Sequence, residues 1–136
     1  MLDLQRLYLE RLTWTVEIAE IEERRRLPAA ERRAREGALL LGKLSARSLA
    51  VVLDERGKTL ASSEFAGRMA DWQQRTGSIT FLIGGADGHA VEVRDRADFV
   101  LSLGPMTWPH LLARALLLEQ IYRAQQILAG HPYHRE

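Results

Sequence analysis

Three short, almost wholly apolar runs constrain the fold of this chain more than any other feature of the sequence. They are SLAVVL at 48–53, SITFLI at 78–83 and FVLSL at 99–103. Runs of this length are typical of strands that are buried on both faces of a sheet. Helix-like segments at 63–75 and 86–97 lie between them, so strand and helix alternate. This alternation predicts the α/β class, with a mostly parallel sheet and helices on both faces.

Four flanking segments complete the predicted order of elements. Apolar residues share one helical face at 4–12, which predicts an amphipathic helix, and they alternate with polar residues at 14–18, as in a half-exposed strand. A second helix is expected to start near Pro28 and to stop near Gly42. The longest helical pattern runs from 110 to 128.

The apolar surface of the 110–128 segment is wider than a single core-facing stripe. Two interpretations stay open: a helix buried deeply in its own domain, or a helix that also packs against a second copy of the chain in a homodimer. The stripe consists of Leu111, Ala115, Leu118 and Tyr122, and it is widened by Leu112, Leu116, Leu117 and Ile121.

The length and charge of the chain limit the class of protein to which it can belong. With 136 residues it is interpreted as a single domain, 1–136. Lysine and arginine exceed aspartate and glutamate by 19 to 18, so charge alone indicates no nucleic-acid partner. The arginine-rich stretch 22–36 is interpreted as a solvated loop and first helical turns, with an RNA contact as the alternative. No apolar run suits a membrane span or a signal peptide, so we expect a cytoplasmic protein.

Loops that suit a ligand follow all three apolar runs. DERGK follows Leu53, GGADG begins at Gly84 and GPMTWP follows Leu103. The carboxyl ends of parallel strands meet at one edge of a sheet, where ligands of α/β proteins bind. We therefore expect the binding pocket at this edge, where Gly84 and Gly85 let the backbone approach a ligand closely.

Several other chemistries lack their motifs. The glycine stretch has neither the G-x-G-x-x-G of dinucleotide sites nor the GK[ST] ending of a P-loop. Without a G-x-S-x-G elbow or a cysteine, nucleophilic hydrolysis has no support. His131 and His134 have an H-x-x-H spacing but no evident third ligand, so no metal site is expected.

Six motifs spread along the chain are recognisable together: YLERLTW at 8–14, VVLDERGK at 51–58, LIGGADG at 82–88, LSLGPMTWPH at 101–110, LLLEQIYRAQ at 116–125 and HPYHRE at 131–136. With these motifs the chain resembles the pseudouridine-N3-methyltransferase family of the ribosomal large subunit, which belongs to the knotted SPOUT class. The resemblance covers essentially the entire chain. Its most specific part is the terminal HPYHRE together with its spacing from the glycine pair.

The resemblance implies a C-terminal trefoil knot and methyl transfer from S-adenosyl-L-methionine (SAM) to N3 of a pseudouridine in 23S rRNA. The partner would be free rRNA or the assembled ribosome, not DNA or a membrane, and no metal would be needed. SAM would lie against Leu53, Gly84, Leu103, Gly104, Pro105, Met106, Thr107 and Trp108. The catalytic and RNA-facing positions would be His110, Arg123, Tyr133 and His134.

The chemistry of the transfer suggests roles for these four side chains. N3 of pseudouridine carries a proton that some group must take, and His110, Tyr133 or His134 could serve as the base or relay to it. Arg123 could stabilise the developing oxyanion. Since His110 and Arg123 are thirteen positions apart on one predicted helix, they point in different directions. A homodimer in which the second copy completes the pocket would bring such groups together.

The beginning of the chain departs from the family pattern, because it starts within the family's first helix. We therefore expect 1–136 to lack the family's first strand. Either the start codon is misassigned, or this is a shortened member, whose stability and activity would depend on that difference. The alternative function is a non-catalytic SAM-binding or ribosome-binding relative that has lost this strand. A third interpretation, a flavodoxin-like nucleotide binder, would use the same strand ends without needing the C-terminal tail.

Overall fold

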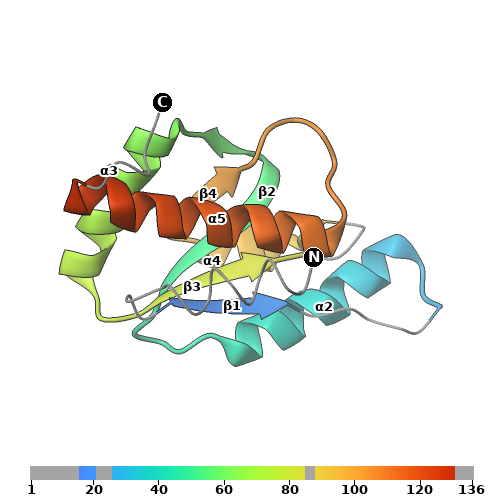
Figure 1. Ribbon diagram of the computed structural model, residues 1–136. Coiled ribbons are helices and arrows are strands. Elements are labelled where there is room, and N and C mark those ends of the chain that lie inside the picture. The colour runs from blue at the N-terminus through green and yellow to red at the C-terminus, as the bar shows by residue number, and fades with distance from the viewer. Residues whose placement is uncertain (1–15, 21–25, 85–87, 131–136) are drawn as a thin grey trace.

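The structure is a computed structural model, and it describes residues 16–20, 26–84 and 88–130. Strands and helices alternate along these ranges (Figure 1). In chain order they are β1 (Val16–Glu20), α2 (Ala29–Lys43), β2 (Leu49–Thr59), α3 (Ser62–Arg75), β3 (Ile79–Ile83), α4 (Val91–Arg96), β4 (Phe99–Ser102) and α5 (His110–Ala129).

The four strands form one sheet in the order β1-β3-β2-β4, and every neighbouring pair is parallel. Ile79 opens β3 and lies opposite both Val16 of β1 and Leu49 of β2. All five residues of β3 and the first four of β2 are buried. The two central strands therefore need apolar side chains on both faces, which explains their continuous apolar runs. The predicted α/β class and parallel sheet are confirmed.

Helices cover both faces of the sheet, so the core has two parts. Alternate residues of a strand point to opposite faces. The larger part lies under α3 and α5, and it includes Val51, Phe81, Phe65, Met69, Trp72, Leu117 and Ile121. The smaller part lies under α2 and α4, and it includes Ala19, Leu40, Ala50, Val52, Leu82 and Val93. In Figure 1, α5 crosses the sheet on the same side as α3.

Local sequence signals set the ends of the main helices. The α2 helix begins directly after Pro28, as predicted, and ends one residue after Gly42. At the start of α3 the Glu64 carboxylate accepts the Ala61 backbone N–H at 3.0 Å, which satisfies one of the free donors of the first turn. The α5 helix ends at Gly130, whose φ of +73° suits glycine. The predicted helices 63–75 and 110–128 are confirmed within one residue.

Two predicted segments have different lengths in the structure. The strand expected at 48–53 continues to Thr59. After an interruption that follows Leu53, Lys58 and Thr59 pair with β4 again, still in parallel. The helix expected at 86–97 covers only Val91–Arg96, since Gly88 has a positive φ of +80° and Ala90 is extended. The helix predicted at 4–12 lies outside the described residues.

The wide apolar surface of α5 is explained mostly within one chain. Its middle is fully buried, with Leu117, Leu118 and Ile121 at 0% exposure. Apolar side chains at its two ends stay exposed, with Leu111 at 48% and Leu128 at 46%. Deep burial therefore accounts for the centre of the stripe, while packing against a second copy stays a prediction for its ends.

Candidate functional site

The carboxyl ends of β2, β3 and β4 meet at one edge of the sheet, as the sequence predicted. Leu53 lies opposite Ile83 of β3 on one side and opposite Leu101 of β4 on the other. Gly84 directly follows Ile83, and the connection to α5 starts two residues after Leu101. The fold therefore brings the first residues predicted to bind a cofactor to the same edge.

An excursion of β2 shapes this edge. Leu53 and Lys58 both pair with Leu101, so the four residues between them leave the regular ladder. Gly57 lies so close to β4 that a Cβ there would stand 2.6 Å from the Val100 carbonyl oxygen. Because no side chain fits at that distance, glycine is required for the excursion to pack against β4.

His89 is a buried residue of the edge that the sequence analysis did not identify. Its side chain packs against Gly84, where a Cβ would meet the imidazole at 3.1 Å, and the residue is only 4% exposed. Neither ring nitrogen has a hydrogen-bond partner in the described part of the chain. Burial lowers the pKa of His89, although Asp54 and the nearby Leu82 and Leu53 backbone oppose the shift. In the sequence, the only feature that points to His89 as a site residue is its position directly after GGADG.

Asp54 and Arg94 form the polar surroundings of His89. The Asp54 side chain is 5% exposed and lies 3.8 Å from the Arg94 guanidinium. Arg94 also donates to the His89 backbone carbonyl at 2.9 Å. These contacts tie α4 and His89 to the middle of β2, where its excursion begins. They also keep a carboxylate and a guanidinium beside an uncharged imidazole.

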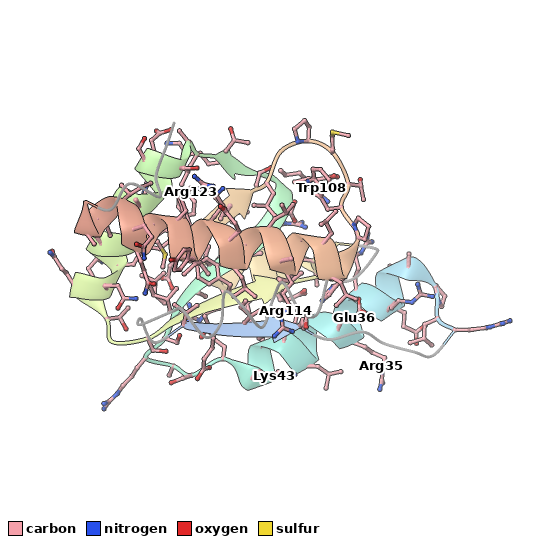
Figure 2. The ribbon with its side chains drawn as sticks, in the orientation of Figure 1. Arg35, Glu36, Lys43, Trp108, Arg114 and Arg123 are labelled. Atoms are coloured by element: carbon pink, nitrogen blue, oxygen red, sulfur yellow. The ribbon has the colours of Figure 1, made fainter. Side chains whose placement is uncertain are left out.

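His110, which the resemblance placed in the site, stands at the first turn of α5 beside the Gly84 turn. Its Nδ1 atom lies 3.1 Å from the Gly84 carbonyl oxygen. Its Nε2 atom contacts the carboxylate of Glu20, the last residue of β1, and Arg114 contacts the same carboxylate. Figure 2 shows Arg114 reaching from α5 to the end of β1. Periodicity gave no sign that Glu20 belongs to this site.

The connection from β4 to α5 carries the remaining predicted cofactor residues. Leu103 and Gly104 are half-buried, whereas Pro105, Met106, Thr107 and Trp108 are exposed. Gly104 has a φ of +112°, and its N–H donates to the Ser102 hydroxyl at 3.0 Å. Trp108 lies on the arch of this connection (Figure 2). The arch therefore has Leu103 and Gly104 close to the sheet, and residues 105–108 form its exposed outer part.

A cavity of about 320 Å³ lies between α3, β4 and α5, which is within the usual range of ligand sites. Leu103 and Gly104 line it, but Leu53 and Gly84 do not, so it coincides with only one side of the predicted site. The other lining residues are Thr59, Leu60, Ser62, Phe65, Leu101, Ser102, Leu117 and Gln120. Hydroxyls and an amide thus face an otherwise apolar hollow.

The whole chain matches a known family. A family model described as "Predicted SPOUT methyltransferase" covers residues 2–134. This chain belongs to the SPOUT methyltransferases. The α/β fold with a parallel sheet agrees with that membership, while the trefoil knot stays a prediction.

Two relatives of this SPOUT methyltransferase are similar along nearly its full length. The ribosomal RNA large subunit methyltransferase H of Rhodospirillum centenum is 54% identical over 134 residues, which are 98% of this chain and 88% of that protein. The protein of the same name from Paramagnetospirillum magneticum is 51% identical with the same coverage. The resemblance found from the motifs is therefore confirmed at the level of the family.

One solved structure is more distant. The ribosomal RNA small subunit methyltransferase E from Neisseria gonorrhoeae, bound to S-adenosyl methionine, gives a TM-score of 0.46 at 17% identity. The match covers 92% of this chain and 59% of that one. At that TM-score the likeness decides nothing about the ligand of this chain.

Arg123, the second predicted catalytic residue, lies apart from His110 in this SPOUT methyltransferase. It follows His110 by thirteen residues, about 20 Å along the axis of α5. Arg114 and Arg123 point to opposite sides of the helix (Figure 2). Arg123 pairs with Glu119 one turn earlier, with Nε 2.8 Å from the carboxylate. One chain therefore does not bring His110 and Arg123 together.

The last two predicted catalytic residues, Tyr133 and His134, lie outside the described residues, as do Gly85 and His131. Within residues 16–20, 26–84 and 88–130, no group of three histidine, cysteine, aspartate or glutamate side chains could hold a metal ion. No helix in the same ranges is long and apolar enough to cross a membrane.

Proposed function

We propose that this SPOUT methyltransferase transfers a methyl group from SAM to N3 of a pseudouridine in 23S rRNA of the large ribosomal subunit. The observation that carries the proposal is the identity of 54% and 51% to proteins named ribosomal RNA large subunit methyltransferase H, along 98% of this chain. Because rRNA and ribosomes are its proposed substrates, we also propose that the protein acts in the cytoplasm. The non-catalytic alternative has no comparable support.

The strand edge and its neighbouring cavity suit SAM. Its adenine and amino-acid ends require apolar contact together with hydrogen bonds. The cavity has apolar walls, and its lining also includes Gly104 and the polar pair Ser62 and Gln120, in which Ser62 donates to the Gln120 side chain at 2.8 Å. When bound, SAM supplies a methyl group on a positively charged sulfur. The assigned cofactor residues are Leu53, Gly84, Leu103, Gly104, Pro105, Met106, Thr107 and Trp108.

The geometry around His110 narrows the search for the base. A base needs a free nitrogen lone pair, but both ring nitrogens of His110 are engaged, one by Gly84 and one by Glu20. We therefore assign removal of the N3 proton to Tyr133 or His134. Arg123 would stabilise the developing oxyanion.

A homodimer would complete such a site. Arg123 is about 20 Å along α5 from His110 within one chain, so a second copy would have to supply it. Exposed apolar side chains border the β4–α5 connection, with Met106 at 68% and Trp108 at 37% exposure. A surface of this kind favours association with another apolar surface.

Methyl incorporation tests the proposed function. Purified protein is incubated with labelled SAM and with ribosomes from cells that lack this modification, and the labelled nucleotide is then mapped. We expect one labelled pseudouridine in 23S rRNA. SAM binding measured by calorimetry without any incorporation would instead support the non-catalytic alternative.

A chain that ends after Gly130 is the matched variant for this assay, because it lacks Tyr133 and His134 but keeps every residue assigned to SAM. We expect its SAM affinity to stay within about threefold, under about 0.7 kcal/mol, while transfer falls more than about a hundredfold. Equal transfer by both forms would contradict the roles given to the tail.

A further inference from the structure

Glu20 is joined to two side chains of α5 at the point where β1 ends. One carboxylate oxygen contacts Nε2 of His110, and the other contacts the Arg114 guanidinium. His110 and Arg114 are four residues apart, so they lie on one face of the helix. All three side chains are between 23% and 30% exposed. We refer to Glu20, His110 and Arg114 as the Glu20 latch.

The latch also holds the end of β3, through the other nitrogen of His110. The Gly84 carbonyl oxygen lies 3.1 Å from Nδ1. A carbonyl oxygen can only accept a hydrogen bond, so Nδ1 must carry a proton and donate it. The imidazole is thus a bridge between the Gly84 backbone and the Glu20 carboxylate.

The contacts of the carboxylate show what Glu20 contributes. The Arg114 guanidinium only donates, so Glu20 accepts from it. The other carboxylate oxygen of Glu20 holds Nε2 of His110. With Nδ1 already donating to Gly84, the ring keeps its orientation only while that second contact exists. In this partly buried place a charge-assisted hydrogen bond is stronger than a pair in open solvent.

We propose that Glu20 is a positioning residue of the cofactor site, acting through His110. It fixes the imidazole, and the imidazole fixes the Gly84 carbonyl and the first turn of α5, where the β4–α5 connection ends. Both segments are assigned to SAM, so the inference rests on the proposed function. His110 in this arrangement orients the site and takes no proton from the substrate.

The test compares two substitutions on the same strand. Glu20→Ala removes the latch, whereas Glu17→Ala removes an exposed carboxylate of β1 that has no part in it. We expect Glu20→Ala to weaken SAM binding at least about tenfold by calorimetry, equal to about 1.4 kcal/mol. The Glu17→Ala protein should bind SAM like the wild type. In the transfer assay the loss should appear as a raised KM for SAM more than as a lowered kcat.

A spectroscopic readout separates positioning from general stabilisation. In protein with nitrogen-15-labelled histidine, the His110 Nδ1–H that donates to Gly84 should be protected from exchange and visible by NMR. Glu20→Ala should lose this protection, because the ring is no longer held from its Nε2 side. Glu20→Gln keeps the shape, and its side-chain amide can still hydrogen-bond to Nε2, so it should retain the Nδ1–H signal and recover part of the SAM affinity. It also serves as the test variant if Glu20→Ala does not fold.

The results of these tests show whether the positioning role of Glu20, the proposed function, or both must be given up. SAM affinity within twofold of wild type in folded Glu20→Ala would overturn the inference and leave the proposed function intact. Equal losses in Glu20→Ala and Glu17→Ala would also overturn it, because the effect would then belong to β1 as a whole. A wild-type protein that binds no SAM would instead overturn the proposed function, and the positioning role with it.

Discussion

Two histidines near the Gly84 turn have opposite environments, and their behaviour should differ accordingly. Both ring nitrogens of His110 contact oxygen atoms, Nδ1 that of the Gly84 carbonyl and Nε2 that of the Glu20 carboxylate. His89 is buried, and neither of its nitrogens has a hydrogen-bond partner in the ranges that the structure describes. Burial disfavours the charged form of His89 more than the Asp54 carboxylate and the Leu82 and Leu53 backbone favour it, so the pKa of His89 is lowered.

The pH dependence of stability should reveal the neutral state of His89. Burial lowers its pKa in the folded protein below the ordinary value of 6.5. Below pH 6.5 the His89 side chain therefore binds a proton more readily in the unfolded chain than in the folded one. The contribution of His89 to the free energy of unfolding is fully present above pH 6.5 and is lost as the pH falls toward the lowered pKa of the folded state. Urea denaturation at several pH values measures this loss.

The control for this experiment is His89→Leu, which fills the space without a titrating group. Other groups contribute to acid destabilisation, so the informative quantity is the difference between the two proteins. We expect the variant to lose less stability than the wild type between pH 8 and pH 5. Parallel pH curves would show that His89 becomes protonated without cost.

Individual site residues were predictable from the sequence when they lay beside a regular pattern. Leu53, Gly84 and Leu103 were identified because each ends an apolar run. Glu20 was missed because its partners are 90 and 94 residues away, and no local period reports such a contact. His89 was missed because a single histidine in a glycine-rich turn does not show whether it is buried.

At the level of elements, the polar excursion of β2 is the feature that depends most on one residue. Gly57→Ala would place a Cβ 2.6 Å from the Val100 carbonyl oxygen, so β2 or β4 must move. We expect a loss of about 1–3 kcal/mol in the free energy of unfolding. Thermal or urea denaturation measures it.

Gly67→Ala in α3 is the matched control, because nothing lies within 4 Å of the added Cβ. Alanine is a better helix former than glycine, so this variant should gain about 0.5–1 kcal/mol. Opposite signs for the two substitutions would support the close approach of Gly57 to β4. A neutral Gly57→Ala would mean that the excursion adapts without strain.

The helices and strands were predictable where burial requires a regular pattern of apolar residues. Strands β2 and β3 were found because central strands must be apolar on both faces, and β4 was found because this edge strand also consists mostly of apolar residues. The extension of β2 beyond Leu53 was not found, since DERGK is polar and reads as a loop. The shortening of α4 depends on the backbone of Gly88 and Ala90, and helical periodicity does not report backbone dihedrals.

At the level of the whole molecule, the association of two copies is the main open prediction. Leu111 is 48% exposed at the first turn of α5, beside the exposed β4–α5 connection. If this surface forms the dimer contact, Leu111→Glu buries an uncompensated charge there and should shift the protein from dimer to monomer. Sedimentation at micromolar concentration measures the change in mass.

Leu39→Glu is the control, because Leu39 is equally exposed, at 47%, on α2 of the other sheet face. It should leave the dimer intact. A wild-type protein that sediments as a monomer would remove the dimer from the proposed function. Leu118, in contrast, is unsuitable for this test, since it is fully buried within one chain.

The long reach of the Glu20 latch has a consequence for the order in which the chain can mature during synthesis. Val16–Glu20 leaves the ribosome early, yet its strand partner is β3 and its carboxylate partners are on α5, 90 residues later. Contacts between distant positions form late, because a long loop must close first. The four strands can therefore meet on the nascent chain before α5 emerges, but the larger part of the core is complete only when α5 packs on the sheet. The site at its edge has to wait for α5.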